Sequence, residues 1–260
     1  MLFRSFVLKI CDAKQDWSME QFVENSIENI SKLDGNVLCG VSGGIDSTVT
    51  ALLIHKAIGD KLKCIFVDNG LLRLNEVEEI ENMFMNNFKI NFVKIDAGKQ
   101  FLSELNGVVD PEAKRKIVGE EFVKIFTRFA KDNGSFTWLA QGTLYPDVIE
   151  SGVSKGPASV IKTHHNVGGL PDWLELKVLE PLRDLYKDEV RKVAKILDVP
   201  ENLIKRHPFP GPGLAVRIIG EVNQHKLEIT RMASKIVEEE LRNAELYDNI
   251  WQAFAIVGDD

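Results

Sequence analysis

The sequence predicts an α/β protein with a doubly wound parallel sheet, and two observations carry that prediction. Short apolar segments of strand length alternate with longer amphipathic segments of helix length between residues 18 and 140. A Gly-rich turn, Ser42 to Ser47, directly follows the first apolar segment. Strands that alternate with helices pair in parallel, with helices on both faces of the sheet and ligand loops at the carboxyl ends of the strands.

The individual elements follow from periodicity and from residues that begin or end helices. Strands are expected at 36–41, 62–67, 91–95, 137–140 and 178–180. Helices are expected at 17–32, 47–58, 76–88, 111–131 and 186–197. Ser18 and Gln21 can form a capping box at the first helix. Pro111 stands at a tolerated first-turn position, and Asp184 is expected to cap the last of these helices.

Three parts are expected along the chain. They are a linker-like segment at 1–17, a main α/β domain at 18–199 and a partial, smaller α+β part at 200–260. Segment 206–214 holds three Pro and two Gly, so regular structure is not expected there, and a strand at 216–222 and a helix at 226–242 follow it. Residues 151–172 are long for a connection, which indicates a lid or binding loop.

The composition is that of a globular protein, with 260 residues, 44% of them hydrophobic, and a net charge of −7. Basic residues cluster only at 114–116, so a nucleic-acid partner is not expected. No segment has membrane-spanning length and no signal-peptide pattern is present, so we expect no membrane partner and a cytoplasmic location. The three Cys lack metal-site spacing and are interpreted as reduced thiols, two of them in strands.

The Gly-rich turn is interpreted as a pyrophosphate-binding loop, which indicates an enzyme that cleaves ATP to AMP and pyrophosphate. Two glycines let the backbone approach a ligand closely, and the following helix presents free amide groups and a partial positive charge. Hydroxyl groups at three positions add hydrogen-bond donors. The expected ATP-binding residues of the loop are Ser42, Gly43, Gly44, Ile45, Asp46, Ser47 and Thr48. The loop lacks the lysine of a Walker A motif, so cations must come from elsewhere.

Asp46 is the residue that indicates a metal. A carboxylate beside bound phosphates is repelled unless a cation lies between them, and Mg²⁺ is commonly held by one or two carboxylates plus phosphates. The alternative is that Asp46 only caps the helix. Asp147 and Glu150 are three residues apart, so one helical turn would let both complete the Mg²⁺ shell.

Several other residues are candidates for ligand binding, and each also has a purely structural interpretation. Lys162 can neutralise the leaving pyrophosphate, and His164 and His165 can contact phosphate, hold a metal or simply lie on the surface. Val67 and Asp68 end the second strand, where a nucleoside contact or a plain turn is expected. Gly142 ends the fourth strand in the same way. Residues 114–116 lie on a helix, and the bare pattern favours a solvated face.

Taken together, the motifs resemble the synthetase part of glutamine-hydrolysing GMP synthase. They are SGGIDSTV, FVDNGLLR, DPEAKRKIVG, LAQGTLYPDVIES, IKTHHNVGGLP, EPLRDLYKDEVR and RHPFPGPGLAVR. The resemblance implies a PP-loop fold similar to the adenine nucleotide alpha hydrolases, and ATP-dependent adenylation of XMP followed by amination with ammonia. It implies ATP and Mg²⁺ at the loop, XMP contact by Arg115, and roles in the ATP, Mg²⁺ and lid machinery for Asp46, Asp147, Glu150, Lys162, His164 and His165.

The resemblance also implies partners. Members of that family are homodimers and carry a glutaminase domain that supplies ammonia, and no part of this chain has the pattern of such a domain. The family's dimerisation domain continues past the motif at 252–255, so this chain resembles only part of it. Two alternatives stay open: another PP-loop amidating ligase such as NAD synthetase, or a nucleotide-binding, dimerising subunit that is inactive without further parts.

Overall fold

The computed structural model describes residues 2–14, 17–151 and 176–258. Its centre is a five-stranded, all-parallel sheet with strand order β3-β2-β1-β4-β5, so the predicted fold class is confirmed. The strands are β1 (Asn36–Gly40), β2 (Leu62–Asp68), β3 (Phe92–Asp96), β4 (Phe136–Ala140) and β5 (Lys177–Leu179). The chain moves from β1 outward to β3 and then returns to add β4 and β5 on the other side.

Side chains of the central strands alternate between two buried cores, as the pleat of a strand requires. In β1, Val37 and Cys39 face one core while Leu38 faces the other. In β2, Cys64 and Phe66 share the core of Val37, and Ile65 lies on the opposite face with Leu38. A sheet that is buried on both faces reads as continuous apolar runs, which explains why these two strands could be predicted without alternating polarity.

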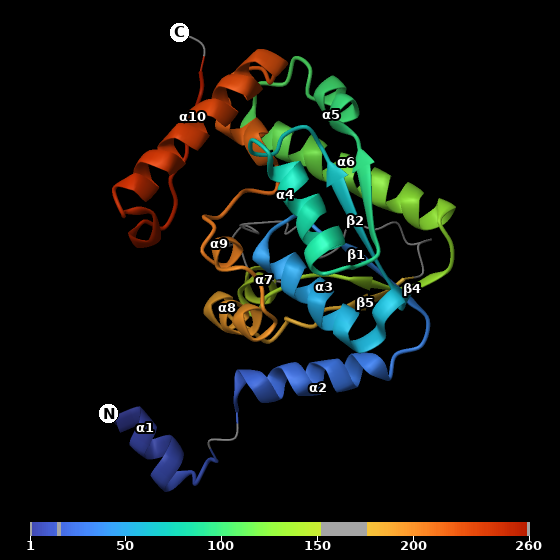
Figure 1. Ribbon diagram of the computed structural model, residues 1–260, viewed down its shortest axis with the longest axis vertical. Helices are drawn as coiled ribbons and strands as arrows, with labels where there is room; N and C mark the ends of the chain where they lie inside the picture. Colours follow the sequence, from blue (N-terminus) through green and yellow to red (C-terminus); the bar gives the residue numbers. More distant parts are fainter. Residues whose placement is uncertain (1, 15–16, 152–175, 259–260) are drawn as a thin grey trace, which may run out of the picture.

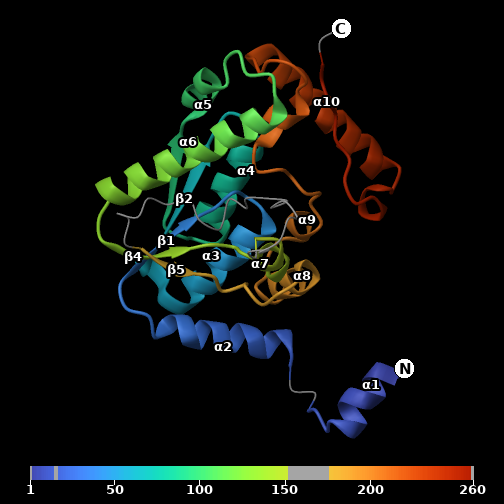
Figure 2. The ribbon, with the colours of Figure 1, turned by 180° about the vertical axis from the view of Figure 1, so that it is seen from behind.

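Helices cover both faces, and Figures 1 and 2 show the two layers from opposite sides. The first layer packs on the core of Val37 and contains α2 (Met19–Ser31), α3 (Ile45–Ile58), α4 (Glu76–Asn82) with the π-turn η3 (Met83–Asn87), and α8 (Lys187–Ile196). The second layer contains α5 (Gly98–Glu104) and α6 (Pro111–Asp132). Ser18 caps α2 by accepting a hydrogen bond from the Gln21 amide at 3.1 Å, which is one half of the predicted capping box, and the Gln21 side-chain amide donates to Asn25 Oδ1 at 3.0 Å.

The remaining described elements are short, apart from one long C-terminal helix. They are α1 (Leu2–Ser5), η1 (Phe6–Ile10), η2 (Gly59–Lys61), α7 (Tyr145–Ser151), α9 (Glu201–Ile204), η4 (Gly213–Arg217), α10 (Gln224–Asn243) and η5 (Tyr247–Asn249). Residues Leu214, Ala215 and Leu227 share a core with Phe101 of α5 and Val118 of α6. The boundary near residue 200 stays a prediction.

Two local predictions were wrong. Residues 216–222 do not form a strand: the 3₁₀ turn η4 is followed by a single bridge between Ile218 and Val257. The carbonyl oxygens that a ladder would use at Ile218 and Gly220 instead accept hydrogen bonds from the Lys114 ammonium. The N-cap of α8 is Tyr186 rather than Asp184, and the Tyr186 amide donates to the Glu189 carboxylate at 2.9 Å.

No helix among the residues that the structure describes combines the length and the apolar character that crossing a membrane would need.

Candidate functional site

The strand order places the Gly-rich loop at the point where the sheet changes direction. β1 lies between β2 and β4, so the connections that leave β1 and β4 diverge to opposite sides. Ligands of open parallel sheets bind in the crevice outside the carboxyl ends of the strands at such a point. Asp68 is the last residue of β2, and Gly142 lies two residues beyond the end of β4, so both are at the edge of the sheet where these strands end. The topology therefore brings the ends of β1, β2 and β4 to one edge of the sheet.

Gly43 fits its position only as glycine. Its φ of +75° lies in the left-handed region, and a Cβ there would stand 2.2 Å from Cδ1 of Ile80 on α4. Gly44 is the N-cap of α3, which begins at Ile45, two residues earlier than predicted. The first three amide groups of α3 therefore belong to Ile45, Asp46 and Ser47, and the first amides of an α-helix have no intrahelical acceptor.

Side-chain hydroxyl groups hold the loop in shape. The Ser47 hydroxyl donates to the Gly44 carbonyl at 3.1 Å and accepts a hydrogen bond from the Ser42 amide at 3.2 Å. The hydroxyl groups of Ser42 and Ser47 are also 3.2 Å apart. Thr48 is buried, and its hydroxyl donates to the same Gly44 carbonyl at 2.9 Å. The loop is thus held in shape by its own hydroxyl groups, and the Thr48 hydroxyl is engaged within the loop. The ATP-binding role of Thr48 stays a prediction.

Asp46 forms an ion pair that sequence reasoning missed. The Lys187 ammonium lies 2.7 Å from Asp46 Oδ1 and 2.6 Å from Oδ2, although the two residues are 141 positions apart. Lys187 is the first residue of α8, and both side chains are partly exposed. The signal in the sequence was a lysine at the start of the helix that follows the last strand, because that strand ends at the same edge of the sheet. Lys187 supplies a cation that the loop itself lacks.

Gly142 packs against the first turn of α3. A Cβ on Gly142 would stand 3.2 Å from the Asp46 carbonyl carbon and 3.3 Å from the Ser47 amide nitrogen, both backbone atoms. Asp147 lies on α7, the helix that follows, and its Oδ2 accepts a hydrogen bond from the Leu144 amide at 2.9 Å. Val67 is buried at the end of β2, and Asp68 Oδ1 accepts a hydrogen bond from the Gly70 amide at 2.9 Å, which is the geometry of a tight turn.

The basic run on α6 is not a solvated face throughout, contrary to the interpretation of the bare pattern. Lys114 is fully buried, and its ammonium donates to the carbonyl oxygens of Ala215, Ile218 and Gly220 at 3.2, 2.7 and 2.6 Å. Burial and the neighbouring Lys226 ammonium lower the pKa of Lys114. Lys116 is 77% exposed.

Arg115 lies between these two lysines in the chain. Its side chain is 38% exposed and pairs with Glu112 at 3.0 Å. The XMP contact that the resemblance implied for Arg115 stays a prediction. Its neighbour Lys114 nevertheless fastens this part of α6 to the segment that follows the Pro- and Gly-rich run.

Only some of the residues predicted for the metal and lid machinery lie in the described part of the chain. Lys162, His164 and His165 lie outside the described residues, and nothing is described of the Glu150 side chain. Among the described side chains, no group of three or more His, Cys, Asp or Glu residues could hold a metal ion. Asp46 and Asp147 are the candidate ligands that remain, at the loop and at the start of α7.

Comparison with known proteins gives high similarity to one kind of enzyme. The chain is 52% identical over 258 residues to the glutamine-hydrolysing GMP synthase of Nitratidesulfovibrio vulgaris, covering 98% of this chain and 50% of that protein. It is 53% identical over 260 residues to the same enzyme of Phenylobacterium zucineum, again covering 50% of that protein. The predicted resemblance is confirmed, and the chain spans about half the length of the curated relatives it matches.

The fold has neighbours among other enzymes. The family model described as NAD synthase matches residues 17–125. The NH3-dependent NAD synthetase of Campylobacter jejuni aligns with a TM-score of 0.53 at 14% identity, over 91% of this chain and 94% of that chain. The NMN synthetase of Francisella tularensis aligns with a TM-score of 0.57 at 16% identity, over 91% of this chain and 93% of that chain. At such identities the likeness shows the fold alone.

Proposed function

We propose that this chain is the catalytic part of a GMP synthetase, an ATP-dependent carbon–nitrogen ligase. In the proposed reaction the C2 oxygen of XMP attacks the α-phosphorus of ATP, and the bond to the β-phosphate breaks. Ammonia then adds to C2, AMP leaves with that oxygen and a proton is released, which gives GMP. The observation that carries the proposal is the preorganised loop at the switch point, paired with Lys187, in a chain 52% identical to GMP synthases over 258 residues.

The loop and Lys187 account for the ATP half of this reaction. Free amides of the first turn of α3, together with the helix dipole, favour phosphate oxygens at this position. The Lys187 ammonium is already at the loop and can turn to the β- and γ-phosphates when its carboxylate partner finds another cation. Transfer of an AMP group needs fixed positive charge and alignment more than a covalent nucleophile.

Mg²⁺ fits the same place. Asp46 is a partly exposed carboxylate directly beside the phosphate cradle, where an uncompensated negative charge would repel ATP. Asp46 and Asp147 would hold the ion together with phosphate oxygens, which matches the oxygen ligands Mg²⁺ prefers. The ion, when bound, would neutralise the charge that develops on pyrophosphate. Lys162, His164 and His165 would act from the lid segment.

Binding of XMP is expected to depend on Arg115 and on the segment at 215–220, which Lys114 joins to α6. Arg115 offers a planar guanidinium that suits a phosphate group, and its partner among the described residues is the exposed Glu112. The expected supplier of ammonia is a glutaminase domain or subunit. A homodimer and a cytoplasmic location are further proposals from the resemblance.

The test measures AMP and GMP after incubation with ATP, Mg²⁺, XMP and ammonium. A form that spans the whole synthetase part of the relatives should make both products in equal amounts. AMP formation that does not depend on XMP would refute the proposal. Lys187→Met should reduce turnover strongly, because it removes the ammonium that pairs with Asp46 at the loop, whereas Lys192→Met on the same helix should not.

A second candidate is favoured by the family model that matches residues 17–125. An NAD synthetase would release pyrophosphate in the presence of nicotinate adenine dinucleotide and ammonium, and not with XMP. Running both substrates side by side separates the two ligases. ATP binding without turnover on either substrate would instead favour a nucleotide-binding subunit.

A further inference from the structure

A hollow lies on the outer face of α8, the helix whose first residue pairs with the Gly-rich loop. Its volume is about 600 Å³, and its walls come from α8, α9, the start of the Pro- and Gly-rich run and the segment around η5. None of the loop residues lines it. Pockets that bind small molecules usually measure about 300–1,000 Å³. The same helix carries Lys187 at its first position, so the two sites share one element.

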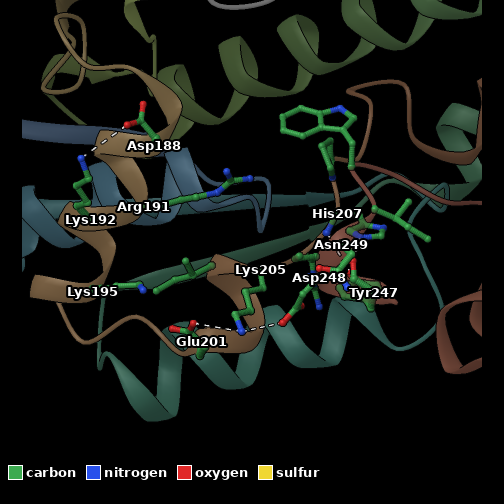
Figure 3. A pocket seen from close by; sticks show the side chains of 15 residues that line it. Asp188, Arg191, Lys192, Lys195, Glu201, Lys205, His207, Tyr247, Asp248 and Asn249 are labelled. Carbon is green, nitrogen blue, oxygen red and sulfur yellow. Dashed lines mark hydrogen bonds and ion pairs between the residues drawn. The ribbon is translucent and has the colours of Figure 1, made fainter. Parts of the chain in front are cut away.

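Two cations of this hollow differ from the other basic residues that line it. Arg191 and Lys195 stand one helical turn apart on α8, and among the described residues neither makes an ion pair or a hydrogen bond. Figure 3 shows both side chains extending from α8 into the space between that helix and η5. The other lining lysines are paired: Lys192 lies 3.7 Å from Asp188, and Lys205 lies 2.8 Å from Asp248.

The wall near η5 is rigid. The rings of His207 and Tyr247 stack at 3.8 Å with an interplanar angle of 2°, and both are buried. The Ala253 amide donates to His207 Nδ1 at 3.2 Å, so Nε2 carries the proton and donates to the Tyr247 carbonyl at 2.9 Å. Arg242 lies over the other side of Tyr247 at 3.8 Å. A wall fixed in this way loses little entropy when a ligand binds.

The hollow also offers apolar surface for a flat ring. Trp251 lines it and is 70% exposed, and Ile250 and Pro208 also belong to its lining. Aromatic side chains bind nucleobases by stacking, because every base has a π-face. Arg and Lys bind phosphate by charge-assisted hydrogen bonds.

We propose that this hollow is a binding site for a nucleoside monophosphate, separate from the ATP loop. The phosphate group pairs with Arg191 and Lys195, and the base stacks on Trp251. Neither feature depends on the reaction proposed above, so the site stands if that reaction is refuted.

The experiment follows the indole N–H resonance of Trp251 by NMR, assigned with Trp251→Phe. GMP and AMP are titrated into the protein, with guanosine and inorganic phosphate as partial ligands. Both nucleotides should shift the resonance, and Arg191→Gln/Lys195→Gln should weaken the apparent affinity at least tenfold. Asp46→Ala removes a side chain of the ATP loop that does not line the hollow, so it should leave these shifts unchanged.

Each other result overturns the proposal. Absence of a shift at millimolar nucleotide would show that the hollow takes no such ligand. Equal affinity in the double variant would remove the two cations from the site. Guanosine equal to GMP would exclude phosphate recognition, and inorganic phosphate equal to GMP would mean an adventitious ion only. A pair of surface substitutions, Lys32→Gln/Lys235→Gln, controls for the loss of two positive charges.

Discussion

Replacing Lys114 by Met should destabilise the protein strongly, although the residue belongs to a basic run of ordinary appearance. The ammonium of Lys114 is fully buried and donates to three carbonyl oxygens, those of Ala215, Ile218 and Gly220. Methionine has nearly the same length and fills the space, so little cavity forms. The loss of stability therefore reports on the three hydrogen bonds and not on packing.

The expected cost follows from opposing terms. Hydrogen bonds to a charged group contribute about 1.5–3 kcal/mol each, and carbonyl groups left without a donor in a buried place add about 1–3 kcal/mol. The substitution also removes the unfavourable burial of a charged ammonium, as the lowered pKa of Lys114 indicates. Removing that desolvation penalty offsets several kcal/mol of the loss. We expect a net loss of about 3 kcal/mol, which corresponds to a fall in Tm of about 6–12 °C for a domain of this size.

Urea unfolding followed by circular dichroism measures this loss, with Lys116→Met as the matched control. Lys116 lies two positions along the same helix, is 77% exposed and has one weak contact to Glu120 at 3.9 Å. The same substitution there should cost less than about 0.5 kcal/mol. Equal midpoints for the two variants would refute the reasoning, because they would show that the three carbonyl contacts add nothing to stability.

Three further outcomes are expected. Asp46→Ala should weaken Mg-ATP binding at least about tenfold by calorimetry, whereas exposed Asp34→Ala should change it less than about twofold; similar losses would contradict the metal role. Gly142→Ala should weaken ATP binding about tenfold because its Cβ meets loop backbone at 3.2 Å, while Gly258→Ala, whose Cβ would meet Ile219 at 3.7 Å, should have no effect. At pH 8 only Cys11 should react quickly with a thiol reagent, because the other two thiols are buried in strands, and fast labelling of a second cysteine would exclude this core.

The last of these outcomes depends on the strand register. Cys39 and Cys64 are Cα partners on β1 and β2, and both are buried. Burial raises the pKa of the Cys64 thiol well above its usual value, and the neighbouring Cys39 thiol adds to that shift. The protonated thiol is therefore favoured in the folded chain. The folded state is thus favoured most while the Cys64 thiol is protonated. That part of the stability is fully present below the pKa of Cys64 in the unfolded chain and is lost as the pH rises through its pKa in the folded chain.

The sheet could be predicted because its signals are local. Residues 36–48 contain an apolar run, a glycine pair and a helix start, one directly after the other. Each of these signals agrees with the next. The strand expected at 216–222 failed for the opposite reason. Its apolar residues suited a strand, but the acceptors at Ile218 and Gly220 are taken by a lysine more than a hundred positions away.

The same distinction explains what was missed at the site. Asp46 was identified from its neighbours in the loop, whereas its partner Lys187 stands 141 positions later. No local pattern separates Lys187 from the exposed Lys192 on the same helix. Only the strand order, which brings the start of α8 to the edge where β1 ends, makes that pairing foreseeable.

Lys187 and Lys114 are expected to support different halves of the proposed reaction. Lys187 joins α8 to the loop, and Lys114 joins α6, next to Arg115, to the segment at 215–220. If Arg115 binds XMP as proposed, loss of Lys114 should raise the KM for XMP more than that for ATP, because it frees the segment beside Arg115 and leaves the loop intact. Loss of Lys187 should do the reverse. A general loss of folding would raise neither KM and would only lower the amount of active protein, so the two ratios separate positioning from stability.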